Sequence, residues 1–186
     1  KLLIETLYAG HDIEFDGSKV REKGATLKTK GGTASGFYPI KELLDFVRKT
    51  IKAARGRRLR DVELHDIICM IGQIVQVGGV RRAALISLSE LSSSAMRYAK
   101  TGVFSKIRYM ANNSAVYDGY LSASEFLGEW KALIESNSGE RGIFNHDAVI
   151  ATMPKRRLDL YKSDEPRFVT NPCFHPDTRI ATANGL

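Results

Sequence analysis

Two kinds of hydrophobic pattern alternate along this chain, and the alternation constrains its fold more than any other feature. Apolar residues recur at helical spacing after Pro39, after Asp61 and after the capping-box pair Ser122 and Glu125. Short runs typical of strands lie at 13–15, 84–88 and 142–145. Helices and strands that alternate in this way favour an α/β architecture.

The helical segments carry apolar faces that we expect to be buried. Asp61 is the expected N-cap of the middle segment, and Cys69 within it is expected to be an unreactive core residue. The two faces consist of Leu64, Ile67, Ile68, Ile71 and Val75 in the middle segment and Phe126, Leu127, Trp130, Leu133 and Ile134 in the third. The charged, aperiodic sequence at 153–166 predicts a surface loop.

Length and composition narrow the class of protein. The chain has 186 residues, enough for one ordinary domain, with 43% hydrophobic and 26% charged residues, the balance of a globular protein. It contains no run of about 18 apolar residues and no secretory leader, so we expect a cytoplasmic protein without a membrane span. It begins with Lys and ends in a turn-like sequence, which suggests a piece of a longer protein. Two cysteines exclude a disulfide framework, and the four histidines lack ligand spacing, so no metal site is predicted.

The net charge of +7 indicates a polyanionic partner, either nucleotide phosphates or nucleic acid, or else a solvated basic surface. Basic clusters lie at 55–60 and 155–157, but they lack the interleaved aromatic residues of nucleic-acid-binding motifs. Residues 16–36 are polar and rich in glycine, which predicts a loop. The lysines, hydroxyls and glycines of its part 28–36 suit a phosphate cradle or an ordinary loop. A basic nucleic-acid-binding module stays open as an alternative, although nucleic acid is the disfavoured partner.

One cysteine has an unusual setting. Cys173 follows a strand-like run, lies between Pro172 and Pro176, and has Asn171 two residues before it. A cysteine held on a loop at the end of a strand can act as a nucleophile or carry a radical. The spacing alone fits an ordinary cysteine equally well.

Six segments occur in the order found in one enzyme family. They are GGTASG (31–36), HDIIC (65–69), GGVRRAALISL (78–88), ANNSA (111–115), SGERGIFN (138–145) and TNPC (170–173). On these segments the chain resembles the ribonucleotide reductases, most closely the adenosylcobalamin-dependent class II enzymes. The segment 78–88 is highly specific. Class I membership, with a separate radical-generating subunit, stays open because no cobalamin contact can be identified in the sequence.

The resemblance implies that residues 1–172 are a segment of the ten-stranded α/β barrel of this family. It also implies conversion of ribonucleotides to 2′-deoxyribonucleotides for DNA synthesis by thiyl-radical chemistry, with adenosylcobalamin as cofactor and thioredoxin or a similar protein as reductant. The family's active-site loop reads Asn-x-Cys-x-Glu, so Asn171 would orient the substrate and Cys173 would carry the radical. This chain has His175 at the third position, where the family has glutamate.

The resemblance also implies where nucleotides bind. Arg21 and Lys28 fall where the family places basic residues that contact a nucleoside triphosphate effector. Residues 104–113, named the relay segment below, correspond to the loop that relays effector identity to the substrate site. Its candidate nucleotide-binding residues are Arg108, Asn112 and Asn113. Binding of nucleotide phosphates by these residues would explain the net charge of +7.

Residues 173–186 do not resemble a reductase. They are similar to the first block of an intein, with cysteine at its first position, an Asp-Thr pair, an apolar strand and Asn-Gly. The implied role of Cys173 is then that of splicing nucleophile, whose thiol attacks the Pro172 carbonyl. The fragment alone would be inactive. The alternative is a divergent reductase without an intein, in which Cys173 is the radical cysteine and His175 takes the place of the family's glutamate.

Overall fold

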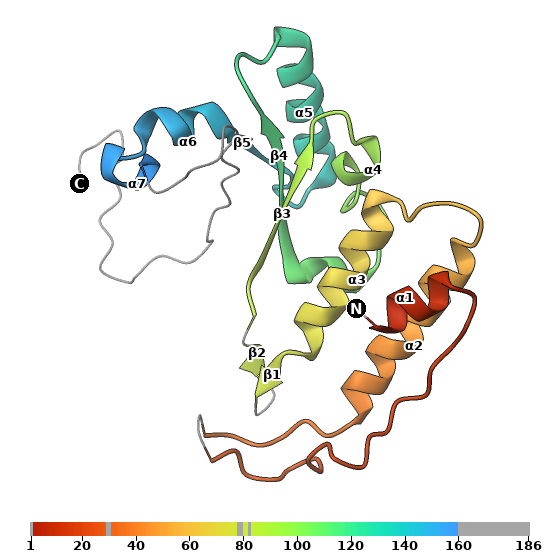
Figure 1. The fold of residues 1–186 in the computed structure, drawn as a ribbon. Coiled ribbons are helices and arrows are strands. Elements are labelled where there is room, and N and C mark those ends of the chain that lie inside the picture. Colours follow the sequence, from red (N-terminus) through yellow and green to blue (C-terminus); the bar gives the residue numbers. More distant parts are fainter. Residues whose placement is uncertain (1, 29–30, 78–79, 82, 160–186) are drawn as a thin grey trace.

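A parallel β-sheet lies at the centre of the fold (Figure 1). The computed structural model describes residues 2–28, 31–77, 80–81 and 83–159. Three strands are hydrogen-bonded in the order β3 (Leu85–Glu90), β4 (Ala111–Tyr117) and β5 (Gly142–Asn145), and both pairings are parallel. The α/β architecture expected from the sequence is confirmed. The ten-stranded barrel is not tested by three strands, and the expected intein strand lies outside the described residues.

Both crossovers between the parallel strands contain helices. The helix α4 (Ser94–Arg97) and the 3-10 helix η1 (Lys106–Met110) connect β3 to β4, and α5 (Ala123–Ser136) connects β4 to β5. Ser122 caps α5 as predicted. Its hydroxyl accepts the Glu125 N–H at 3.2 Å, and the Glu125 carboxylate accepts the Ser122 N–H at 3.0 Å.

Three helices precede the sheet and share a small core. They are α1 (Leu2–Tyr8), α2 (Tyr38–Ala53) and α3 (Asp61–Ile74), with α2 in contact with both others. Pro39 lies in the first turn of α2, as predicted. The buried side chains of this core are Leu3, Val47, Ile51 and Ile67. Burying one such aliphatic side chain stabilises a fold by about 1.5–3 kcal/mol.

Four short elements complete the described structure. The strands β1 (Gln76–Val77) and β2 (Val80–Arg81) pair antiparallel, α6 (His146–Thr152) follows β5 directly, and α7 (Lys155–Leu158) comes last. The surface loop predicted at 153–166 is therefore wrong at its start, where the Pro154 carbonyl accepts the Arg157 N–H at 2.8 Å and begins α7. Every helix in the described ranges is too short or too polar to cross a lipid bilayer.

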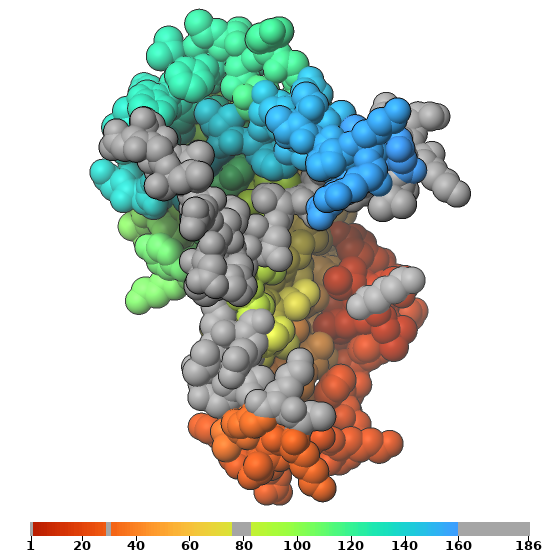
Figure 2. Space-filling model, turned by 90° about the vertical axis from the view of Figure 1, so that its left-hand side faces the viewer, coloured from red at the N-terminus to blue at the C-terminus, as the bar shows by residue number. Residues whose placement is uncertain are grey.

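Residues 16–36 form an arm at the end of the molecule opposite α5 (Figure 1 and Figure 2). At its base the rings of Phe15 and Phe37 stack, with centroids 5.6 Å apart. Inside the arm, Thr26 and Thr33 form a single antiparallel bridge. The loop predicted for this stretch is confirmed, and it is a closed loop whose two ends meet beside α2.

The strand predicted at 13–15 is wrong. This segment has no regular secondary structure and is held by the side chains of α2. Arg48 donates to Asp12 Oδ1 at 2.9 Å and to the Ile13 carbonyl, and Lys52 Nζ donates to Asp12 Oδ2 at 2.9 Å. Hydrogen bonds from Lys52 and Arg48 lower the pKa of Asp12 to about 2. Salt bridges to a helix therefore replace the expected pairing with a strand.

The expected cap and apolar faces also need correction. Arg60, not Asp61, is the N-cap of α3, because the Glu63 carboxylate accepts the Arg60 N–H at 2.8 Å. The expected core face of α3 is buried only at Ile67, and the other members are 43–50% exposed: Leu64, Ile68, Ile71 and Val75. On α5 the exposed members, at 43–62%, are Phe126, Leu127, Trp130 and Ile134. The described residues leave both faces uncovered.

Candidate functional site

Four polar residues from three elements meet where α3 lies against η1 and the start of β4. The helix α3 supplies His65 and Asp66, η1 supplies Arg108, and β4 supplies Asn113. We call them the α3–β4 cluster. Three of the four belong to segments that carry the family resemblance, 65–69 and 111–115.

Asp66 and Arg108 form a bidentate ion pair. Arg108 Nε donates to Asp66 Oδ1 at 2.6 Å, and Arg108 Nη2 donates to Asp66 Oδ2 at 2.8 Å. The third nitrogen, Nη1, donates to the Ala99 carbonyl at 2.7 Å. Burial works to raise the pKa of Asp66, but hydrogen bonds from Arg108 and His65 outweigh it and hold the pKa below its usual value. The carboxylate is therefore charged at neutral pH, and the guanidinium is fully engaged within the chain.

His65 reaches β4 from the same turn of α3. Its Nε2 lies 3.0 Å from Asn113 Oδ1, its Nδ1 lies 3.6 Å from Asp66 Oδ1, and both ring nitrogens lie 3.7 Å from the Cys69 sulfur. Burial opposes the charged imidazolium, yet hydrogen bonds to Asp66, Cys69 and Asn113 raise the pKa of His65 to about 9. An imidazolium with a proton on each nitrogen suits the acceptors on both sides.

Asn113 is held by its backbone as well as by its side chain. Its N–H donates to Glu140 Oε2 at 2.9 Å, and the buried Lys100 Nζ lies 2.8 Å from the same oxygen while also donating to the Ala111 carbonyl. Asn113 is only 2% exposed, and its Nδ2 has no hydrogen-bond partner among the described residues. The Glu140 carboxylate and the Lys100 ammonium group thus fix the backbone at the start of β4.

The side chains of the cluster bind one another and lie largely inside the fold. The neighbouring thiol, that of Cys69, is 0% exposed, which confirms its expected place in the core. The structure brings Arg108 and Asn113 together in this cluster, with both side chains engaged by α3. Asn112 is exposed and points to the other face of β4, because successive residues of a strand alternate.

The structure does not bring the two expected effector residues to this cluster. Arg21 and Lys28 lie on the arm, are exposed, and make no hydrogen bond or ion pair with other described residues. Gly31 and Gly32 on the same arm have positive φ angles of 67° and 83°, where glycine costs little. Asn171, Cys173 and His175, the expected catalytic loop, lie outside the described residues.

One of the two basic clusters has an internal role. Arg57 donates to both carboxylate oxygens of Glu63 at 2.7 Å, and Arg60 Nη2 donates to Glu63 Oε1 at 2.9 Å. These two arginines stabilise the start of α3, while their side chains stay 41% and 66% exposed. The alternative of a nucleic-acid-binding module is not tested by these pairs.

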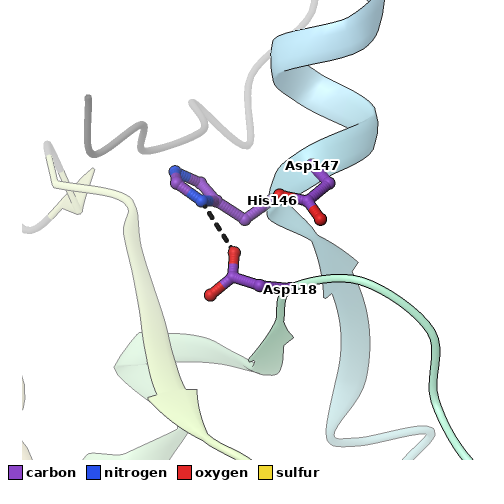
Figure 3. A group of neighbouring side chains, drawn as sticks. All are labelled: Asp118, His146 and Asp147. Carbon is purple, nitrogen blue, oxygen red and sulfur yellow. Dashed lines mark hydrogen bonds and ion pairs between the residues drawn. The ribbon is translucent and has the colours of Figure 1, made fainter. Parts of the chain in front are cut away.

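A second polar group lies at the carboxyl ends of β4 and β5 (Figure 3). Asp118 follows β4, and His146 and Asp147 follow β5, so that one ligand atom from each lies within 4.8 Å of the others. The sequence gives no hint of this group, because its members are brought together by strand pairing. His146 Nδ1 lies 2.9 Å from Asp118 Oδ1, and Asp147 Oδ2 accepts the Gly119 N–H at 2.6 Å. Hydrogen bonds inside the chain thus already engage the three side chains.

Sequence reasoning missed His65 and Asp66 as functional candidates. They lie in the family segment 65–69, whose sequence alone does not indicate which residues they contact. A signal was present, since two adjacent polar residues interrupt an apolar helix and one of them faces its buried side. Periodicity could not identify their partners, because Arg108 and Asn113 are 42 and 48 residues away in the chain.

Comparison with known proteins gives one consistent relationship. The chain is 33% identical over 180 residues to the adenosylcobalamin-dependent ribonucleoside-triphosphate reductase of Levilactobacillus brevis and 31% identical over 178 residues to that of Lacticaseibacillus paracasei. Each alignment covers 93% of this chain and 22% of the relative. The enzyme of the same name from Euglena gracilis is 40% identical over 79 residues, 42% of this chain and 11% of the relative.

The chain spans about a fifth of the length of the curated relatives that it matches over most of its length. No family model matches it, and no solved structure matches it. The relatives nevertheless all carry the same enzyme name. Over most of its length the chain is therefore a distant homologue of the adenosylcobalamin-dependent ribonucleotide reductases.

Proposed function

We propose that residues 1–172 are a segment of the catalytic barrel of an adenosylcobalamin-dependent ribonucleotide reductase, which converts ribonucleotides to 2′-deoxyribonucleotides by thiyl-radical chemistry. The observation that carries this proposal is the alignment of 93% of the chain with enzymes of that name. The whole enzyme would use thioredoxin or a similar reductant and work in the cytoplasm. The isolated fragment would be inactive, because it is about a fifth of its relatives' length.

The architecture supports a barrel segment. The three parallel strands follow one another in chain order, as in a sheet that closes on itself. Among the described residues β3 has a strand partner on one side only, and an open groove of about 590 Å³ lies beside it, between α3 and β3. The uncovered apolar faces of α3 and α5 also suit a segment that packs against further barrel elements.

The described residues do not fit a corrin ring. The buried side-chain atoms that lack a partner among them are Thr101 Oγ1 and Asn113 Nδ2, two single atoms inside the fold rather than the lining of a large pocket. The support for adenosylcobalamin as cofactor of the whole enzyme is the name that the homologues carry.

The arm and the relay segment form the proposed regulatory part. Arg21 and Lys28 would bind the phosphates of a nucleoside triphosphate effector on the arm, where Gly31 and Gly32 are exposed and have positive φ angles. The relay segment 104–113 would transmit effector identity to the ribonucleotide. In it Asn112 is the exposed candidate for nucleotide contact, whereas Arg108 and Asn113 act through position.

We infer a different function for residues 173–186, the start of an intein inserted at the active-site loop. The support for this proposal is the resemblance of these 14 residues to the first block of an intein. In the first splicing step the Cys173 thiol loses its proton, its sulfur bonds to the Pro172 carbonyl carbon, the Pro172–Cys173 C–N bond breaks, and the released amine takes up the proton. The product is a thioester.

If the intein is absent, Cys173 itself would carry the radical and Asn171 would orient the substrate. His175 would then stand in for a carboxylate, and an imidazole would have to serve as the acid–base group. This alternative predicts that reductase sequence resumes directly after Leu186.

The test is to express the complete reading frame that contains this chain and to analyse its product by mass spectrometry and by ribonucleotide reduction with added adenosylcobalamin. A shortened, spliced protein that reduces ribonucleotides is expected. Replacing Cys173 by Ala should then leave the precursor unspliced. A protein of full unspliced mass that is active would overturn the intein. No reduction by either the spliced or unspliced protein would overturn the reductase.

A further inference from the structure

We propose that Asp118, His146 and Asp147 bind one divalent metal ion of the zinc class at the carboxyl ends of β4 and β5 (Figure 3). We call these three residues the strand-end triad. One ligand atom from each of them lies within 4.8 Å of the other two. The site lies outside the proposed function, since its ion is bound whether or not the protein reduces ribonucleotides.

The parallel pairing of β4 with β5 determines which residues meet at this edge. In the last register pair Tyr117 lies opposite Asn145, so the next residues, Asp118 and His146, leave the sheet side by side. His146 Nδ1 accordingly lies 2.9 Å from Asp118 Oδ1. Two atoms bound at right angles to one ion, each at about 2.1 Å, are about 3.0 Å apart. The spacing of these two atoms is therefore already that of neighbouring metal ligands.

Asp147 completes the triad from the first turn of α6. Its Oδ2 accepts the Gly119 N–H at 2.6 Å, which ties its carboxylate to the turn directly after Asp118. Gly119 has a φ angle of 67°, in the left-handed region that favours glycine, and allows the chain to turn here. The cap of α6 is a different side chain, that of Asn145, which accepts the Ala148 N–H at 2.9 Å. The Asp147 carboxylate is thus held beside Asp118 and is not needed to cap the helix.

The dipeptide His-Asp occurs three times in the chain, at 11–12, 65–66 and 146–147. In the first two the aspartate is bound by basic side chains, which are Arg48 and Lys52 in one and Arg108 in the other. The third differs, because among the described residues no lysine or arginine forms an ion pair with Asp147 or with Asp118. Two neighbouring carboxylates thus lack a basic counter-charge in a chain of net charge +7, and a bound cation would supply one.

The donor set selects the class of ion. One imidazole nitrogen with two carboxylate oxygens suits Zn²⁺ and its spectroscopic substitute Co²⁺, whereas Mg²⁺ and Ca²⁺ prefer ligands that are all oxygen. Opposite ligands of such an ion lie about 4.2 Å apart, so a small rotation of the exposed Asp118 side chain suffices to bring the three atoms onto one ion. With three protein ligands and 71% of the Asp118 side chain exposed, water would complete the coordination.

Metal binding to the protein expressed from the complete reading frame, without an affinity tag and after treatment with a chelator, tests the proposal. The protein is titrated with Co²⁺, followed by visible absorption, and with Zn²⁺, followed by calorimetry. Asp118→Asn keeps the shape of an exposed side chain and removes one charged ligand. It should weaken binding at one site by about 100-fold or more, because loss of even an outer partner of a metal ligand costs about 10–100-fold. His146→Gln and Asp147→Asn should weaken the same site.

His11→Gln is the matched control. His11 is exposed and also precedes an aspartate, but Asp12 is already bound by basic side chains of α2. The control should bind Zn²⁺ as the wild type does. Equal loss of binding in His11→Gln and Asp118→Asn, or no loss in any of the triad variants, would overturn the site. Displacement of Zn²⁺ by about a tenfold excess of Mg²⁺ would overturn the class of ion.

Hydrogen exchange locates the ion in the wild type alone, without any substitution. Saturating Zn²⁺ should slow exchange by about tenfold or more at the amides of Gly119 and Ala148, which adjoin the triad, and leave the amides of the arm unchanged. Unchanged exchange at 118–119 and 146–148, or equal slowing across the chain, would overturn the site. Neither readout involves ribonucleotide reduction, so an inactive protein that binds Zn²⁺ at the triad would overturn only the proposed function.

Discussion

Replacing Glu129 by Gln should destabilise the chain more than any other single removal of charge on α5. Glu129 is 1% exposed and binds two arginines: Arg141 through Nε at 2.9 Å and Nη2 at 2.7 Å, and Arg97 through Nε at 2.7 Å. Burial works to raise the pKa of Glu129, but hydrogen bonds from Arg141 and Arg97 outweigh it and keep the pKa below its usual value. The carboxylate is therefore the counter-charge of a buried guanidinium.

The magnitude follows from what the substitution leaves behind. Gln keeps the shape and one acceptor oxygen but removes the charge opposite Arg141, which is itself 2% exposed. Removing one partner of a buried ion pair costs about 3–5 kcal/mol, and the retained acceptor places this case near 3 kcal/mol. With a urea dependence of about 1–3 kcal/mol per molar, the unfolding midpoint should fall by about 1 M or more.

Urea unfolding of the 186-residue chain can be followed by the fluorescence of Trp130, its one tryptophan, which neighbours Glu129 on α5. Glu135→Gln is the control on the same helix, because its pair with Lys131 is exposed and its atoms are 3.7 Å apart. An exposed pair contributes at most about 0.5 kcal/mol. Equal midpoints for the two variants would refute the reasoning that this buried network holds α5 to the sheet.

Three further outcomes are expected. Because the pKa of His65 is raised to about 9 in the folded state, its contribution to folding is complete below the ordinary value near 6.5 and is lost as the pH rises through 9. The free energy of unfolding, measured by urea titration between pH 6 and 10, should therefore fall by on the order of 3 kcal/mol, and His65→Gln should remove this slope. Ser122→Ala should cost about 0.5–2 kcal/mol, seen as a lower urea midpoint, while an unchanged midpoint would show that the cap does not hold α5. Phe15→Ala should weaken the base of the arm by about 0.5–1.5 kcal/mol, and Phe37→Ala should have an equivalent effect on the ring stack. The measurement is hydrogen exchange, which should become faster at the amides of 16–36 and stay unchanged in β4.

Local signals predicted the elements that short-range physics determines. The capping box at Ser122, the proline that opens α2 and the apolar run that becomes β3 each depend on residues within one or two turns. The strand predicted at 13–15 is wrong because distant residues determine the conformation of this segment. The segment is held by Arg48 and Lys52, which lie 35 to 40 residues away in the chain and so leave no local signal.

The apolar faces illustrate a second limit. A helical period in apolar residues indicates that a face prefers to be covered, and it says nothing of what covers it. On α3 and α5 the preference is present, at Ile68 and Trp130 for example, but the described residues supply no cover. The α3–β4 cluster shows the same limit for polar residues, since the polar residues of α3 could be seen in the sequence while their partners could not.

Glu140 occupies a place in the sheet that a backbone group would ordinarily take. The β4–β5 pairing begins at Ser114 and Gly142, and the N–H of Asn113, one residue earlier, is taken by the Glu140 carboxylate. A slip of β5 by one residue would pull Glu140 away from Asn113 and Lys100 and would move Arg141 off Glu129. The two charged residues before β5 therefore act as a register lock, which specifies one alignment of a strand too short to specify it by itself.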